Sequence, residues 1–168
     1  MTPHPATPSG AVDAIDVTLS RSSGGVLELR YTLKGELHRV RIPEPRRPLF
    51  ADELWRHTCF EVFVRDQSSE AYHEFNFSPS GEWAAYAFSG YRQGMRSPED
   101  FPRPQIALRR EARALTLEAG VEIGSAPAQL ALSAVVEDTD GTVSYWALTH
   151  PSARPDFHHP DAFALHLP

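Results

Sequence analysis

Cysteine is nearly absent from the chain, because Cys59 is the only one among its 168 residues. One cysteine cannot form an internal disulfide or a thiolate metal cluster, and it fits a reducing compartment. The N-terminus lacks the charged start and apolar run of a secretory signal. No apolar stretch approaches the roughly 20 residues that a membrane helix needs. We therefore expect a cytoplasmic protein that does not enter a membrane.

Basic residues are in the minority, since 16 Lys and Arg stand against 22 Asp and Glu, a formal net charge of −6. Binding to a nucleic-acid backbone or to anionic lipid needs a basic face, so both partners are disfavoured. Hydrophobic residues make up 41% of the chain, an ordinary value for a globular protein. We predict a disordered or extended tail over residues 1–10 and a single ligand-binding domain over residues 11–168. Its oligomeric state is left open.

Helical periodicity is also scarce, whereas alternation of apolar and polar residues recurs along the chain. Turn-forming residues separate the alternating runs, which indicates many short antiparallel strands. Such a pattern predicts an all-β fold, a sandwich or a barrel, with one short helical turn near Asp52. Two proline-rich stretches, 41–52 and 91–104, are predicted to be long loops, which are often functional. The alternating runs are residues 15–19, 27–33, 40–42, 115–123 and 163–167.

The segment 54–91 predicts a ribbon of three antiparallel strands over residues 58–65, 71–78 and 82–89. A turn at residues 67–68 would place Phe60 opposite Phe75 on an apolar face, and the next turn would place Trp83 opposite Phe77. The other face would then set Glu61 directly opposite Glu74. That second face comprises Cys59, Glu61, Phe63, Tyr72, Glu74, Asn76, Ala84, Tyr86 and Phe88.

Like charges directly opposite one another destabilise a sheet, so the predicted second face is unusual. Its carboxylates, amide and phenol, beside the small Ala84, are suited to binding hydroxyl groups or a cation. The alternative is an ordinary solvated face, with the repulsion relieved by Arg56 or Arg92.

Four stretches of the chain resemble the bacterial DOMON-like domains, which are related to the family 9 carbohydrate-binding modules. They are residues 54–61 (LWRHTCFE), 74–86 (EFNFSPSGEWAAY), 144–150 (SYWALTH) and 155–158 (PDFH). The resemblance extends over roughly residues 27–167. It implies an all-β antiparallel β-sandwich of the jelly-roll type with a ligand site for a sugar or for haem, and related modules also carry structural calcium.

We therefore predict a non-catalytic module that binds a saccharide or a similar polar small molecule. Tryptophans would stack on the sugar ring, the carboxylates and the amide would bind its hydroxyls, and Arg56 would pair with charge. No cofactor, metal ligand or catalytic residue is assigned. The predicted ligand-binding residues are Trp55, Arg56, His57, Glu61, Glu74, Asn76, Tyr86, Trp146 and His150.

Several alternatives stay open. A haem-binding or redox module would pair Met95 with His57, His73 or His150. A small glycoside-acting enzyme would use Glu61 and Glu74 as its acid and base. Less favoured are a Cys59–His57 pair, a purely structural or interaction domain, and a metal site in the tail. That last site would draw on His150, Asp156, His158 and His159.

Overall fold

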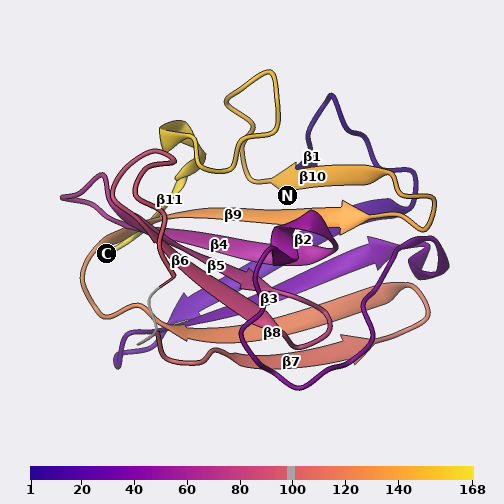
Figure 1. Cartoon of the computed structure of the whole chain (residues 1–168), viewed down its shortest axis with the longest axis horizontal. Helices are drawn as coiled ribbons and strands as arrows, with labels where there is room; N and C mark the ends of the chain where they lie inside the picture. The colour runs from indigo at the N-terminus through magenta and orange to yellow at the C-terminus, as the bar shows by residue number, and fades with distance from the viewer. Residues whose placement is uncertain (98–100) are drawn as a thin grey trace.

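Two antiparallel β-sheets pack face to face in the computed structural model, which describes residues 1–97 and 101–168 (Figure 1). This confirms the predicted all-β sandwich. Part of the predicted loop 91–104 lies outside the described residues. The described helical elements are the 3-10 turns η1 (Leu37–Arg39), η2 (Leu54–Arg56) and η3 (Pro160–Ala162). None of the described helices is long and apolar enough to cross a membrane.

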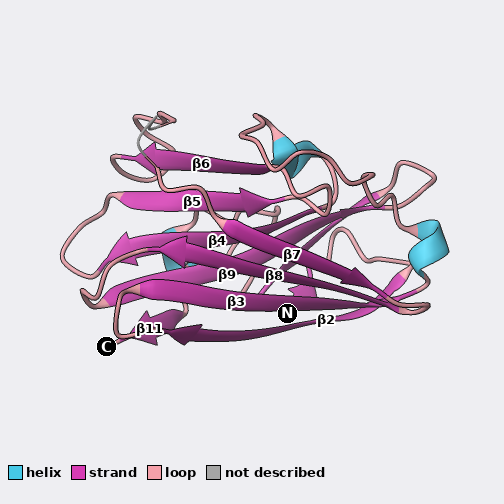
Figure 2. Cartoon of the chain, turned by 90° about the horizontal axis from the view of Figure 1, so that it is seen from below, coloured by secondary structure: helices cyan, strands magenta, loops and turns pink. Residues whose placement is uncertain are grey.

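The larger sheet is built around β9, which pairs with β4 on one side and with both β10 and β11 on the other. The smaller sheet has the order β2–β3–β8–β7 and lies in front of the larger one in Figure 2. The larger sheet contains β1 (Thr2–Pro3), β10 (Val143–Ala147), β9 (Ala128–Glu137), β4 (Cys59–Asp66), β5 (Tyr72–Phe77), β6 (Trp83–Phe88) and β11 (Leu165–Leu167). The smaller sheet contains β2 (Val12–Arg21), β3 (Val26–Gly35), β8 (Ala114–Glu122) and β7 (Gln105–Arg110).

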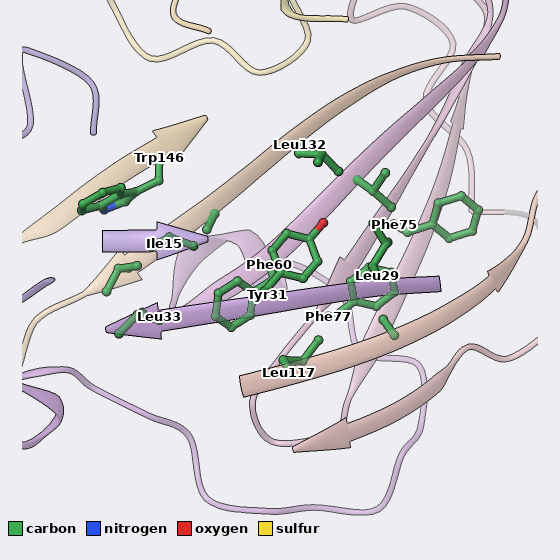
Figure 3. Close-up of a cluster of buried hydrophobic side chains, with 14 of the residues drawn as sticks. Ile15, Leu29, Tyr31, Leu33, Phe60, Phe75, Phe77, Leu117, Leu132 and Trp146 are labelled. Atoms are coloured by element: carbon green, nitrogen blue, oxygen red, sulfur yellow. The ribbon is translucent and has the colours of Figure 1, made fainter. Parts of the chain in front are cut away.

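The main core fills the space between the sheets, where alternate residues of each strand point inward. Figure 3 shows these side chains gathered between the layers, with Trp146 towards one end and Phe75 towards the other. Tyr31 is fully buried there, and its hydroxyl donates to the backbone oxygen of Glu61 at 2.8 Å. This bond ties β3 to β4, so the inner packing helps fix which residues of β4 point outward.

The pairing of β4 with β5 differs from the predicted register. Phe60 lies opposite Phe77, two residues further along β5 than predicted. Glu61 therefore lies opposite Asn76, and the predicted direct pair of Glu61 with Glu74 is wrong. Because the shift is two residues and side chains alternate with period two, every side chain keeps its predicted face.

The cause of the shift is the turn between the two strands. Asp66 accepts hydrogen bonds from the backbone N–H of Ser68 at 2.7 Å and from that of Ser69 at 3.1 Å, which closes the turn further along the chain than predicted. The next pairing is as predicted, with Phe77 opposite Trp83.

The alternation of apolar and polar residues did not predict every strand, and one of the alternating runs does not form a strand. Residues 40–42 contribute only a single bridge, between Val40 and Asp138, beyond the 3-10 turn η1. Strands β7 and β9 lie outside the alternating runs. At the N-terminus, Thr2–Pro3 pairs with β10 and His4 is buried, so this end of the chain packs as an extended segment.

Candidate functional site

A second apolar cluster covers the outer face of the larger sheet, on the side away from the main core. The segment from residue 148 to residue 164, yellow in Figure 1, passes on the side of β9 and β10 away from β7 and β8. It contributes Ala162 and Phe163 to the cluster, with Phe157 packed against them. The strand residues of the cluster are Phe63, Tyr72, Ala84, Tyr86, Phe88 and Ala131.

A pocket of about 360 Å³ opens in this face, a size within the usual range of about 300–1,000 Å³ for small-molecule sites. Carboxylates from β4 and β5 line it, together with polar groups from neighbouring segments. Aromatic side chains form much of the remaining wall. The lining residues are Trp55, Glu61, Phe63, Glu74, Tyr86, Phe88, Arg92, Met95, Val135, Tyr145, Pro155, Phe157 and His158.

The two carboxylates of the pocket are almost completely buried, with Glu61 2% and Glu74 5% exposed. One oxygen of Glu61 accepts a hydrogen bond from the Ser133 hydroxyl of β9 at 2.8 Å. One oxygen of Glu74 accepts from the side-chain amide of Asn76 at 2.8 Å. Asn76 is fully buried beside Glu74, so the structure places it behind the pocket lining, where it holds a carboxylate in position.

Burial raises the pKa of both carboxyl groups. For Glu74 the pKa rises to about 7, although the Asn76 hydrogen bond and the charge of Arg92 oppose the rise. For Glu61 the pKa rises to about 8, because repulsion from Glu74 adds to desolvation and outweighs the Ser133 hydrogen bond. Near neutral pH the pair therefore retains part of its protons, and it can either donate or accept hydrogen bonds.

A histidine from the C-terminal segment completes this polar side of the pocket. His158 is mostly buried, and desolvation lowers its pKa to about 4, so the ring is neutral at pH 7. The Tyr72 hydroxyl lies 2.7 Å from its Nδ1 and accepts the backbone N–H of Arg92 at 3.3 Å. Burial raises the pKa of Tyr72 to about 12, so we assign this phenol as the donor to Nδ1. The remaining proton of His158 is then on Nε2, which lies 3.7 Å from a Glu74 oxygen.

The C-terminal segment is fastened to the loop after β6 by one carboxylate. Asp156 accepts hydrogen bonds from the Tyr91 hydroxyl at 2.6 Å and from the Arg92 guanidinium at 2.8 Å. Arg92 has a left-handed backbone with φ of 52°, which turns the loop at this point. This ion pair keeps together two segments that line the pocket.

The exposed aromatic edge of the pocket is held by Tyr86. Its hydroxyl donates to Asp52 at 2.5 Å and accepts from the backbone N–H of Glu53 at 3.2 Å, immediately before the turn η2. That turn presents Trp55, which is 42% exposed. Arg56 lies over the Trp55 ring at 5.3 Å and pairs with Glu53 at 2.6 Å. Arg56 therefore supports the Trp55 ring and does not line the pocket.

Four of the nine predicted ligand-binding residues line the pocket together, namely Trp55, Glu61, Glu74 and Tyr86. Trp146 instead points into the core between the sheets, and its indole N–H donates to Ser144 at 3.0 Å. His57 lies 2.7 Å from Glu137. His150 lies 2.9 Å from the backbone oxygen of Thr2 and packs edge-on against the His4 ring. The structure does not bring these last three into the pocket.

The residues proposed for the alternative chemistries are scattered. Met95 lines the pocket, but His57, His73 and His150 lie outside it, and His73 packs against Phe101. Within residues 1–97 and 101–168 no group of three or more His, Cys, Asp or Glu is placed to hold a metal ion.

Cys59 is a poor nucleophile in this setting. It is fully buried behind the pocket, 3.7 Å from the Asn76 oxygen, and burial raises the pKa of its thiol well above the ordinary value. His57, the partner considered for it, is directed at Glu137.

Sequence reasoning missed the contribution of Tyr145, Phe157 and His158. For Tyr145 the strand pattern indicated only that Tyr145 and Trp146 point to opposite faces, and it did not say which of the two faces the core. Phe157 and His158 lie in a segment without regular structure, and no periodicity could place them.

The comparisons with known proteins give a fold and no family. No protein-family model matches the chain, and no curated protein matches it. The chain is similar to the crystal structure of a candidate carbohydrate-binding protein from Bacteroides uniformis, with a TM-score of 0.58. The match has 14% sequence identity and covers 95% of this chain and 82% of that chain. At this identity the likeness shows the fold alone, and the resemblance to the DOMON-like domains stays a prediction.

Proposed function

We propose that this protein is a non-catalytic module that binds a saccharide in the pocket on the outer face of the larger sheet. The observation that carries the proposal is the composition of that pocket. Aromatic walls lie beside two buried carboxylates that end in the same cavity of about 360 Å³. Saccharides present apolar C–H faces and hydroxyl edges, so they match such a lining.

The proposed role of each pocket residue follows from the chemistry of its side chain. Trp55 offers an exposed ring at the mouth, and Phe157 and Tyr145 offer further apolar surface. Glu61 and Glu74 accept hydrogen bonds from ligand hydroxyls. The Arg92 guanidinium carries donors for ring or hydroxyl oxygens.

Two further observations support the proposal. The similar solved structure is itself a candidate carbohydrate-binding protein. The sequence motifs that resemble DOMON-like domains include Glu61, Glu74 and Tyr86. A shared fold permits many functions, so the pocket composition remains the main support.

The test is calorimetric titration against a panel of mono- and oligosaccharides. Trp55→Ala should weaken binding about tenfold, since loss of a stacking aromatic costs on the order of 1–2 kcal/mol. Leu108→Ala, an exposed apolar residue on β7 of the smaller sheet, is the matched control and should leave affinity unchanged. Absence of binding to every saccharide, or equal affinity of the Trp55 variant, would overturn the proposal.

Glycoside cleavage is the second candidate, because one observation favours it. The raised pKa of Glu61, about 8, keeps that group protonated at neutral pH, as a general acid requires. Turnover of a saccharide that binds, abolished in Glu61→Gln, would replace the non-catalytic proposal. Binding without turnover would support it.

A further inference from the structure

The pocket carries two acidic groups without a fixed cation beside them. Among the described residues Glu61 forms no ion pair, and the nearest basic group to Glu74 is His158 at 3.7 Å. His158 is neutral at pH 7, because burial lowers its pKa to about 4. When it is ionised, the buried pair therefore has no cation of the described chain in contact with it, and only the more distant charge of Arg92 acts on Glu74.

The cations nearby are already paired with other carboxylates. Arg92, the one basic side chain besides His158 among the described pocket lining, is held by Asp156 at 2.8 Å. Arg56 is paired with Glu53 at 2.6 Å and lies over the Trp55 ring. Without a ligand the pair retains protons near neutral pH, and a contacting cation for its ionised form would have to come from a ligand.

Each carboxylate also keeps an unused acceptor. The Ser133 hydroxyl occupies one oxygen of Glu61, and the other oxygen has no hydrogen-bond partner among the described residues. The Asn76 amide occupies one oxygen of Glu74, and the other has only the 3.7 Å contact with His158. Both side chains are more than nine-tenths buried, and both line the pocket.

An ammonium group suits these acceptors better than a hydroxyl does. It carries three donors and a full positive charge, so it can bond both groups and stabilise their ionised forms, whose mutual repulsion otherwise favours the protonated state. A hydroxyl has one donor and leaves the repulsion in place. The aromatic walls act in the same direction, since the faces of Trp, Tyr and Phe rings attract cations.

We propose that the ligand of this pocket is an amino saccharide with a free ammonium group, which is bound between Glu61 and Glu74. This inference rests on the saccharide-binding function proposed above and names the class of saccharide. The sugar ring then lies against the aromatic walls, and Trp55 covers its outer side.

The experiment compares sugars that differ only at one substituent. Glucosamine, galactosamine and the free-amine oligomers of glucosamine are titrated into the protein, each beside its N-acetylated form and its neutral parent sugar. We expect the free-amine member of a set to bind at least tenfold tighter than the other two. Hydrogen bonds to charged groups add on the order of 1.5–3 kcal/mol, which corresponds to about 10- to 150-fold.

The variants locate the effect. Glu61→Gln and Glu74→Gln keep the side-chain shape, and each should reduce the preference for the free amine at least tenfold while affinity for the neutral sugar changes little. Glu118→Gln, an exposed glutamate on β8 paired with Arg30, is the matched control and should keep the full preference. If one pocket variant does not fold, as judged by circular dichroism, the other still gives the result.

The outcomes separate this inference from the proposed function. A neutral or N-acetylated sugar that binds as tightly as the free amine would overturn the ammonium site and leave saccharide binding intact. A simple alkylammonium ion that binds while no sugar does would support the acidic site and refute saccharide binding. Failure of every sugar and of the alkylammonium ion would refute both.

Discussion

The burial of Glu61 should make the folded protein less stable as the pH rises. In the folded state this carboxyl titrates at about 8, against an ordinary value of 4.5. Between these values the folded chain holds a proton that the unfolded chain has released. The unfolded state binds fewer protons there, so the free energy of unfolding falls with increasing pH through this window.

The magnitude follows from the size of the shift. Between pH 4.5 and pH 7 the free energy of unfolding falls by about 1.36 kcal/mol for each pH unit because of this group. The loss at pH 7 is therefore about 3 kcal/mol. Glu61→Gln removes this cost, but the new amide must replace the carboxyl group in the Ser133 hydrogen bond, and a hydrogen bond is worth about 1 kcal/mol. We therefore expect the variant to be more stable than the wild type by about 2 kcal/mol at pH 7.

The assay is urea denaturation of the wild type, Glu61→Gln and the control Glu118→Gln at pH 5 and at pH 7.5. The stability advantage of Glu61→Gln should be small at pH 5 and larger by about 3 kcal/mol at pH 7.5. Glu118→Gln should follow the wild type at both values. Parallel pH dependences for the wild type and Glu61→Gln would show that this carboxyl is not held protonated, and the reasoning would be refuted.

Three further predictions concern other parts of the site and core. His158 has its pKa lowered to about 4 from 6.5, so acid must charge a buried ring: relative to His158→Gln, the wild type should lose about 3 kcal/mol of stability between pH 6.5 and pH 4 in pH-dependent thermal denaturation. Asp156→Asn weakens the bonds from Tyr91 and Arg92, so hydrogen exchange over residues 148–164 should speed up while global stability changes by less than about 1 kcal/mol. Phe60→Ala in the main core should cost about 3–5 kcal/mol in urea denaturation, and a cost below 1 kcal/mol would contradict the packing described.

The two faces of the middle ribbon could be predicted from the sequence, because alternation along β4, β5 and β6 assigns each side chain to a face. The register could not, since it depends on how Asp66 closes the turn between β4 and β5. A two-residue shift leaves the faces intact but changes the neighbours of Glu61 from Glu74 to Asn76.

The central strand β9 could not be predicted from the sequence, for a different reason. It is buried on both faces, and its outer face mixes apolar residues with buried polar ones, so no regular alternation of apolar and exposed polar residues marks it. The outer-face residues are Gln129, Ala131, Ser133, Val135 and Glu137. Its neighbour β10 follows the usual rule, with Trp146 inward and Tyr145 outward, but the sequence did not say which of the two faced the core.

The position of the C-terminal segment could not be predicted from local sequence patterns. His158 and Phe157 reach the pocket because Asp156 fastens the segment to the loop after β6, a contact between residues more than 60 positions apart. No local pattern encodes such a contact. The histidine that lines the pocket is therefore His158, whereas the ligand-binding histidines predicted from the sequence were His57 and His150.

The most direct test of the proposed site is to follow the indole N–H signals of the three tryptophans by NMR during a saccharide titration. Trp55 lines the pocket and is 42% exposed, whereas Trp83 and Trp146 belong to the main core. We predict that the Trp55 signal shifts in a saturable way and that the other two stay in place. A bound saccharide that leaves Trp55 unmoved would contradict the location of the site.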